Sequence, residues 1–182
     1  SAAQNDAETL TYLSPRFSGL RFGISYIPHA QQDDTGVASQ TGFAHDGVSG
    51  GLNYSKDFDG MKLDASATLH WAHAPNGVNN AQNPWAYTAG FHVGAGQFSG
   101  GIAWAHQVEG AVNAAGTFST EGYGGLAGVS YTDGPFSTSA NFWYGRREGV
   151  VGDAQNEEDT TIGAGVSGRY FLGPGIDVRG TL

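Results

Sequence analysis

Hydrophobic and polar residues alternate along most of this chain. In residues 61–71, MKLDASATLHW, every odd position is apolar and every even position is polar. A period of two puts successive side chains on opposite faces, so this segment predicts a β-strand with one apolar and one polar face. We find no convincing helix. Nine other segments show similar alternation: 8–16, 20–27, 48–58, 85–95, 98–107, 123–131, 136–145, 162–170 and 176–182.

The connections between these segments are alternately short and long. Short ones such as DFDG (57–60) and TDGP (132–135) carry the Gly, Pro and Asp that tight turns require. The long ones are 29–46, 73–84, 108–120 and 147–159. Tight turns at one end and long loops at the other predict an all-β fold, an antiparallel up-and-down meander of about ten strands.

The composition of the two faces predicts which one meets water. Polar positions are mostly Gly, Ser, Thr and Asn, whereas the water-exposed face of a soluble sheet normally carries far more Lys and Glu. Aromatic residues on the apolar face gather near strand ends, as at the two interfaces of a membrane. We therefore predict a transmembrane β-barrel with an aromatic girdle made of Tyr26, Tyr54, Trp71, Trp85, Tyr87, Tyr131, Phe136, Tyr144 and Tyr170.

On this reading the polar face lines a water-filled pore. The residues predicted to line it are Arg21, Lys62, Asp64, His70, His92, Asn141, Arg169, Asp177 and Arg179. Opposed rows of charge would orient polar solutes across the pore, but each charge could equally be a hydrated wall residue. Trp143 shares the parity of Asn141 and could stack on a sugar, unless a local bulge turns it outward.

Composition limits the remaining possibilities. The 182 residues fit a single domain, 1–182, and the absence of Cys excludes disulfides and zinc–thiolate sites. A net charge of −9 argues against a nucleic-acid partner and leans weakly towards cation preference in a pore. Neither end resembles a natural terminus, so we expect a part of a longer polypeptide.

Two motifs are specific, TLTYLSPRFSGLRFGISYIP at 9–28 and LGPGIDVRG at 172–180. They resemble general diffusion porins of Gram-negative bacteria, most closely the alphaproteobacterial type. The resemblance implies ten strands of a sixteen-stranded, homotrimeric barrel in the outer membrane, in contact with its lipid and lipopolysaccharide. It also implies a passive channel for small hydrophilic solutes and ions, with the constricting loop before the SPRF strand, so that this chain would begin just after that loop. Closure of ten strands into a smaller barrel is the alternative.

Other candidate chemistry is weak. His70 and His73 point to opposite faces of one strand, and DFDG lacks the acidic pattern of a calcium loop, so we expect no metal. No serine sits in a Gly-x-Ser-x-Gly elbow, and we expect neither a cofactor nor an enzyme. The acidic runs Asp33–Asp34 and Glu157–Asp159 are read as solvated loops, or as bridges through divalent cations to lipopolysaccharide phosphates.

Two rival functions stay open at this stage. One is an outer-membrane barrel enzyme, a protease or lipase, with its site at the long-loop end, where His45, Asp46 and His73 are the only hints. The other is a secreted, soluble adhesin or solenoid, which predicts a fixed repeat that the sequence does not display.

Overall fold

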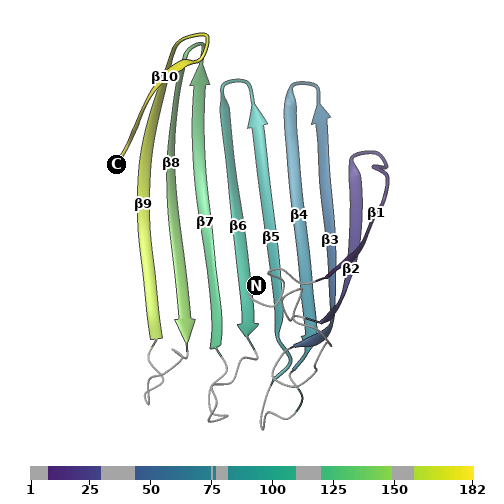
Figure 1. The fold of residues 1–182 in the computed structure, drawn as a ribbon. Coiled ribbons are helices and arrows are strands. Elements are labelled where there is room, and N and C mark those ends of the chain that lie inside the picture. The colour runs from purple at the N-terminus through teal and green to yellow at the C-terminus, as the bar shows by residue number, and fades with distance from the viewer. Residues whose placement is uncertain (1–7, 30–43, 75, 77–81, 110–119, 149–157) are drawn as a thin grey trace.

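The chain forms one curved antiparallel sheet of ten strands in the order β1 to β10 (Figure 1). The structure is a computed structural model, and it describes residues 8–29, 44–74, 76, 82–109, 120–148 and 158–182. Within these residues, no helix is long and apolar enough to cross a membrane. The strands are β1 (Leu10–Leu13), β2 (Leu20–His29), β3 (His45–Phe58), β4 (Met61–His73), β5 (Trp85–Ala95), β6 (Phe98–Glu109), β7 (Thr120–Asp133), β8 (Phe136–Glu148), β9 (Glu158–Gly173) and β10 (Ile176–Thr181).

The predicted all-β up-and-down meander is confirmed, because each strand pairs with its neighbours in sequence. Five short turns lie at one end of the sheet, the upper end in Figure 1, and the long connections lie at the other. Much of each long connection, including the acidic runs at 33–34 and 157, lies outside the described residues. Strands β1 and β10 are the two edges, so the ten strands form an open sheet and not a small closed barrel.

Several strands begin or end at other residues than the alternation predicts. Strand β9 spans Glu158–Gly173, whereas the alternation marked only 162–170. Its first residues, EDTT, are polar on both faces, so they continue the backbone pairing without an apolar signal. Strand β1 is shorter than predicted because Pro15 has no N–H to donate. Just before it, the Ser14 backbone N–H donates to the Phe22 carbonyl, and the Ser14 hydroxyl accepts the Phe22 N–H at 3.0 Å.

Two of the short turns use a pair of residues with positive φ. Asp59 and Gly60 have φ of 51° and 92°, and Ser18 and Gly19 have φ of 48° and 93°. Two successive positive φ angles define the tight turn whose twist matches that of paired strands. The Asp59–Gly60 turn therefore fixes the register of the β3–β4 hairpin, whereas the Ser18–Gly19 turn closes the Phe17–Leu20 bridge, which is shifted by one residue from the β1–β2 pairing.

Strand β3 contains a bulge at its long-loop end. The pairing of β3 with β4 shifts between His45 and Val48, and Asp46 has a φ of 50°. An extra residue in one strand re-aims the side chains around it. Here the Asp46 carboxylate accepts a hydrogen bond from the Tyr26 hydroxyl on β2, at 2.5 Å.

The register defines two faces of the sheet. Residues paired directly across an antiparallel ladder share a face. We call polar face the one that contains the successive partners Arg21, Asn53, Ser66, Gly90, Ala103, Leu126, Trp143 and Gly163. We call apolar face the one that contains Phe22, Leu52, Ala67, Ala89, Trp104, Gly125, Tyr144 and Ile162.

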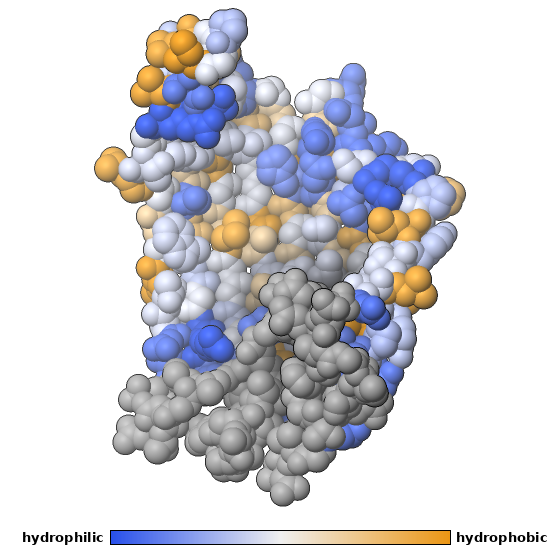
Figure 2. Space-filling view, in the orientation of Figure 1, coloured by the Kyte–Doolittle hydropathy of each residue, from blue (hydrophilic) through white to orange (hydrophobic). Residues whose placement is uncertain are grey.

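No second layer of described residues covers the apolar face. Among the described residues, the hydrophobic side chains that are buried are Ile27 and Ala72, whereas Ile102, Val129 and Ile162 on the apolar face are each more than 60% exposed. Soluble monomers rarely expose a continuous apolar surface of this kind. Figure 2 shows strongly hydrophilic residues at the upper and lower ends of the visible face, with weakly polar and hydrophobic ones between them. A soluble two-layer sandwich is therefore not what this chain forms.

Gly19 and Gly60 provide a test of the turn geometry. Their φ angles are nearly equal, but a Cβ on Gly19 would lie 2.8 Å from the Ser55 carbonyl oxygen, whereas Gly60 faces open space. We expect Gly60→Ala to cost about 1–2 kcal/mol of unfolding free energy from backbone strain. Gly19→Ala should cost a further ~1–3 kcal/mol because of the clash. Urea titration of the refolded protein in detergent micelles measures both, and equal losses would contradict the turn geometry.

Candidate functional site

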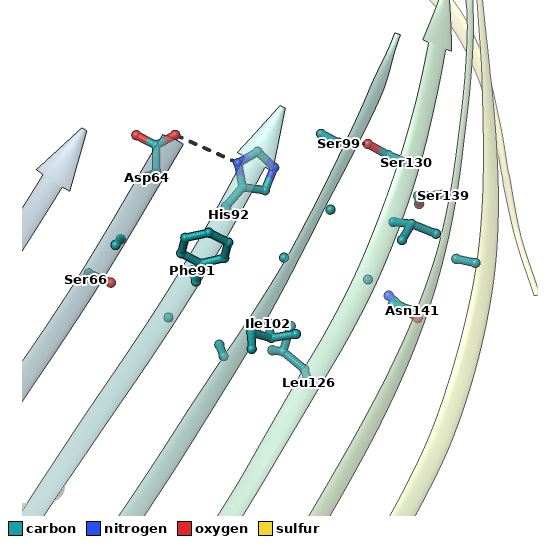
Figure 3. Close-up of a pocket in the computed structure, with 18 of the residues that line it drawn as sticks. Asp64, Ser66, Phe91, His92, Ser99, Ile102, Leu126, Ser130, Ser139 and Asn141 are labelled. Atoms are coloured by element: carbon teal, nitrogen blue, oxygen red, sulfur yellow. Dashed lines mark hydrogen bonds and ion pairs between the residues drawn. The ribbon is translucent and has the colours of Figure 1, made fainter. Parts of the chain in front are cut away.

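The polar face is hollowed in three places along the sheet. A hollow of about 480 Å³ lies over β4 to β8, one of about 560 Å³ over β1 to β4, and one of about 550 Å³ near the long-loop end of β5 to β9. Figure 3 shows the first of them, with Asp64 and His92 at one side and Ser130, Ser139 and Asn141 at the other. The candidate functional site is therefore an extended surface and not one closed pocket.

Paired hydroxyl groups run across the polar face. Thr68 and Thr88 lie 2.7 Å apart between their hydroxyl oxygens, and so do Ser99 and Ser130. The same contact recurs between Ser139 and Ser167, again at 2.7 Å. Each pair sits on adjacent strands, so each hydroxyl has a partner across the ladder and still presents an oxygen to the space above the sheet. The result is a surface that is polar but largely uncharged.

One charged group lies on β4 and β5 near the short turns. The Asp64 carboxylate accepts a hydrogen bond from the Ser55 hydroxyl at 2.5 Å. The same carboxylate lies 3.4 Å from the Lys62 ammonium and 3.9 Å from the His92 ring (Figure 3). These side chains are partly exposed, so the ion pairs are screened by water and contribute little to stability.

A second charged group lies on β9 and β10 at the same end of the sheet. The Asp177 carboxylate is 3.1 Å from Arg169 and also pairs with Arg179. Both cations share one acid, so this group carries one net positive charge. Acids and bases are neighbours within each of these two groups, and a transverse field across a pore stays a prediction.

Arg21 belongs to a third group, at the first hairpin. Its Nε donates to the Ser14 carbonyl at 3.1 Å. Arg16, which the sequence reading did not single out, donates to the Gly19 carbonyl at 2.6 Å and to the Asn53 side chain at 2.8 Å. Both guanidinium groups are therefore held by the turn that connects β1 and β2. Arg16 is the arginine of the SPRF motif, so this motif was the signal in the sequence that pointed to it.

All nine residues predicted to line a pore lie on the polar face. His70 is mostly buried there, with its ring 2.8 Å from the Ser49 hydroxyl. Asn141 and Trp143 also lie on this face, because β8 pairs with β7 and β9 without any register shift. The bulge that could have turned Trp143 outward is absent from β8.

All nine residues predicted for the aromatic girdle lie on the apolar face, at two levels. At the long-loop level, Trp85 stacks near Tyr87 with ring centroids 6.0 Å apart, and both contact His106. At the short-turn level, Tyr131 contacts Phe98 at 4.9 Å. Two further rings at the long-loop level, Trp104 and Tyr123, were not predicted for the girdle, and they stack at 5.6 Å.

One row of paired residues on the apolar face is aromatic at one end and acidic at the other. Trp71 pairs with Trp85, then Val108, and the row continues through Glu121, Glu148 and Glu158. Arg146 binds Glu148 at 3.0 Å and also pairs with Glu158, and His106 lies 2.7 Å from Glu121. The three carboxylates are far apart in sequence, so only the strand register reveals that they are neighbours.

The bulge in β3 brings together the residues that hinted at an enzyme. His45 Nδ1 lies 2.9 Å from an Asp46 oxygen, and the His45 ring stacks on His73 at 5.5 Å. His45 is buried, and its Nε2 has no hydrogen-bond partner among the described residues, so no described hydroxyl is placed to act as a nucleophile. No group of three or more His, Asp or Glu among the described residues could hold a metal ion.

Comparison with known protein families identifies the chain. The family model described as Gram-negative porin matches residues 1–182. Comparison with curated proteins gives no match. The family match agrees with the single antiparallel meander and with an apolar face that no second layer covers. The chain therefore belongs to the Gram-negative porin family and is a β-barrel protein of the outer membrane.

Proposed function

We propose that this protein forms a passive, water-filled channel for small hydrophilic solutes and ions. The observation that carries the proposal is the difference between the two faces of a one-layer sheet. One face exposes aliphatic and aromatic side chains, and the other exposes hydroxyl groups, glycines and paired charges. In a barrel, the first face suits lipid and the second suits water. The polar face would then form part of the channel wall.

The spacing of the aromatic residues supports the proposed orientation in the membrane. On β7, Tyr123 and Tyr131 are eight residues apart, and on β8 Phe136 and Tyr144 have the same separation. Eight residues at about 3.3 Å each span about 26 Å along a strand. At the strand tilt of about 35–45° found in outer-membrane barrels, this length corresponds to about 19–21 Å of height, slightly less than their apolar band of about 25 Å. The long connections would then face the exterior and the short turns the periplasm.

Solutes would be selected mainly by size, with weak selection by charge. Among the side chains that the structure describes, the polar face carries six basic and four acidic groups, namely Arg16, Arg21, Lys62, Arg147, Arg169 and Arg179 against Asp57, Asp64, Asp159 and Asp177. The net charge of −9 therefore arises mostly outside this surface. The cation preference suggested by the whole-chain charge does not follow for this part of the wall.

The proposed partners are membrane components and further copies of the chain. The porin family favours a homotrimer in contact with outer-membrane lipid and lipopolysaccharide. Glu121, Glu148 and Glu158 lie at the long-loop level of the apolar face, where divalent cations could connect them to lipopolysaccharide phosphates. No catalytic activity is proposed, because the His45 cluster lacks a positioned nucleophile among the described residues.

Conductance in a planar bilayer tests the proposed function directly. Protein extracted in detergent from its native membrane should produce stepwise currents that are linear in voltage, as expected for ions that diffuse through an open, water-filled passage. A homotrimer should give steps in groups of three. A folded, detergent-soluble sample that carries no current would overturn the channel and bring the enzyme alternative forward.

Tryptophan accessibility tests which face meets lipid. Trp104 on the apolar face and Trp143 on the polar face are almost equally exposed, at 40% and 41%. In lipid vesicles, Trp143→Phe should remove fluorescence that aqueous iodide quenches, and Trp104→Phe should remove fluorescence that brominated acyl chains quench. The opposite assignment would show that the polar face is turned towards the membrane.

Arg179 tests the contribution of wall charges to selectivity. Arg179→Gln leaves Asp177 paired with Arg169 and removes one exposed positive charge from the polar face. Under a salt gradient, the reversal potential should move towards cation selectivity by a few millivolts. The matched control is Arg146→Gln on the apolar face, which should leave the potential unchanged. Equal shifts in both variants would contradict the assignment of the two faces.

A further inference from the structure

Trp143 is the only one of the four tryptophans that lies on the polar face. Trp71, Trp85 and Trp104 all lie on the apolar face, where a porin meets lipid. The assignment of Trp143 rests on uninterrupted pairing along β8, in which it faces Leu126 on β7 and Gly163 on β9. A large aromatic ring on a face otherwise rich in Gly, Ser and Thr calls for a specific explanation.

The indole of Trp143 rests on Gly163. A Cβ built on that glycine would meet the indole Cζ2 at 2.1 Å and Cε2 at 2.2 Å, so any other residue there would displace the ring. Supported in this way on backbone, the ring is still 41% exposed. The indole N–H has no acceptor among the described residues and is available to donate a hydrogen bond.

The residues around the ring leave room above it. On the polar face the neighbouring positions of β7, β8 and β9 are glycines: Gly124, Gly128, Gly145 and Gly165. The exceptions are Leu126, which is 55% exposed beside the ring, and two polar neutral residues, Asn141 and Thr161. The Asn141 side-chain oxygen lies over Gly165, where a Cβ would approach it to 2.8 Å. The whole patch is uncharged.

We propose that Leu126, Asn141, Trp143, Thr161 and Gly163, the Trp143 patch, form a weak binding site for the pyranose rings of sugars that pass along the channel wall. The inference rests on the proposed channel function. One face of a pyranose ring carries C–H groups, which stack on the negative face of an indole, and its rim carries hydroxyl groups. The indole N–H and the amide of Asn141 are placed to bond those hydroxyls.

The chemistry of the patch argues against ionic solutes. The charged side chains on the polar face of β7 to β9 lie towards the strand ends, as with Arg147 and Arg169. An anion or a cation at the patch would have no opposite charge to compensate its lost hydration. A neutral, hydroxylated ring loses less hydration free energy at the patch, and it gains both stacking and hydrogen bonds. A purely structural role, in which Trp143 only covers a glycine-rich stretch of strand, is the competing explanation.

Sugar-induced current blockage separates these explanations. The full porin is placed in a planar bilayer, and maltohexaose is added at millimolar concentration to one side. Trp143→Leu keeps apolar bulk over Gly163 but removes the aromatic face, and Trp143→Phe keeps an aromatic face without the N–H. We expect the apparent Kd for maltohexaose to rise about tenfold in Trp143→Leu and two- to threefold in Trp143→Phe, while open-channel conductance changes little.

Two controls distinguish binding from sieving and from damage to the fold. Trp104→Leu alters an equally exposed tryptophan on the apolar face and should leave the maltohexaose Kd unchanged. A polyethylene glycol of similar mass should reduce the current equally in wild type and Trp143→Leu, because it cannot stack. Open wild-type channels that maltohexaose does not block, or equal blockage in wild type and Trp143→Leu, would overturn the sugar site alone. Absence of channels in the wild type would overturn the proposed function itself.

Discussion

The structure depends on one constraint, the satisfaction of every backbone N–H and C=O group in a region that offers no water. A sheet meets this requirement through its ladder, which here runs without interruption from β2 to β9 apart from the bulge near the long-loop end of β3. Once the ladder is complete, side chains on one face are free to be as apolar as lipid. On a soluble protein, the exposed Ile, Val and Phe residues would cause aggregation. Here they are solvated by lipid.

The same constraint explains where charges are allowed on the apolar face. Arg146, His106 and three glutamates lie at its long-loop level, in the same rows as aromatic rings, and each of these side chains pairs with another. Charge in hydrocarbon is costly, whereas at the interface it is hydrated. The polar face needs no such confinement because it meets water, and its charged groups around Asp64 and Asp177, near the short turns, are partly exposed. The two faces of the same strands therefore differ in where they can carry charged side chains.

Much of the fold was readable from the sequence because alternation and turn residues are local signals. The strand cores and the two levels of aromatic residues belong to this class. Contacts that depend on register were not readable, since a shift of one residue moves every side chain to the other face. The row of Glu121, Glu148 and Glu158 is one example. Another is Trp143, whose neighbours Leu126 and Gly163 lie 17 and 20 residues away in sequence. The bulge at Asp46 also escaped, because the turn-type pair Asp46-Gly47 lies at the edge of the long connection predicted at 29–46 and gave no separate signal.

The row that runs from Trp71 to Glu148 has a geometric consequence. Starting at Trp71 on β4, the aromatic level reaches Tyr144 on β8, which is four residues short of Glu148, the residue in register with Trp71. Since both tyrosine and tryptophan mark the same membrane boundary, that boundary crosses the ladder obliquely, by about one residue per strand. One residue rises about 3.3 Å and neighbouring strands lie about 4.8 Å apart, which corresponds to a strand tilt of about 35°. Tilts of 35–45° are those of membrane barrels. The positions of the aromatic residues thus record the inclination of the strands, and together with strand number that inclination sets the width of a closed barrel.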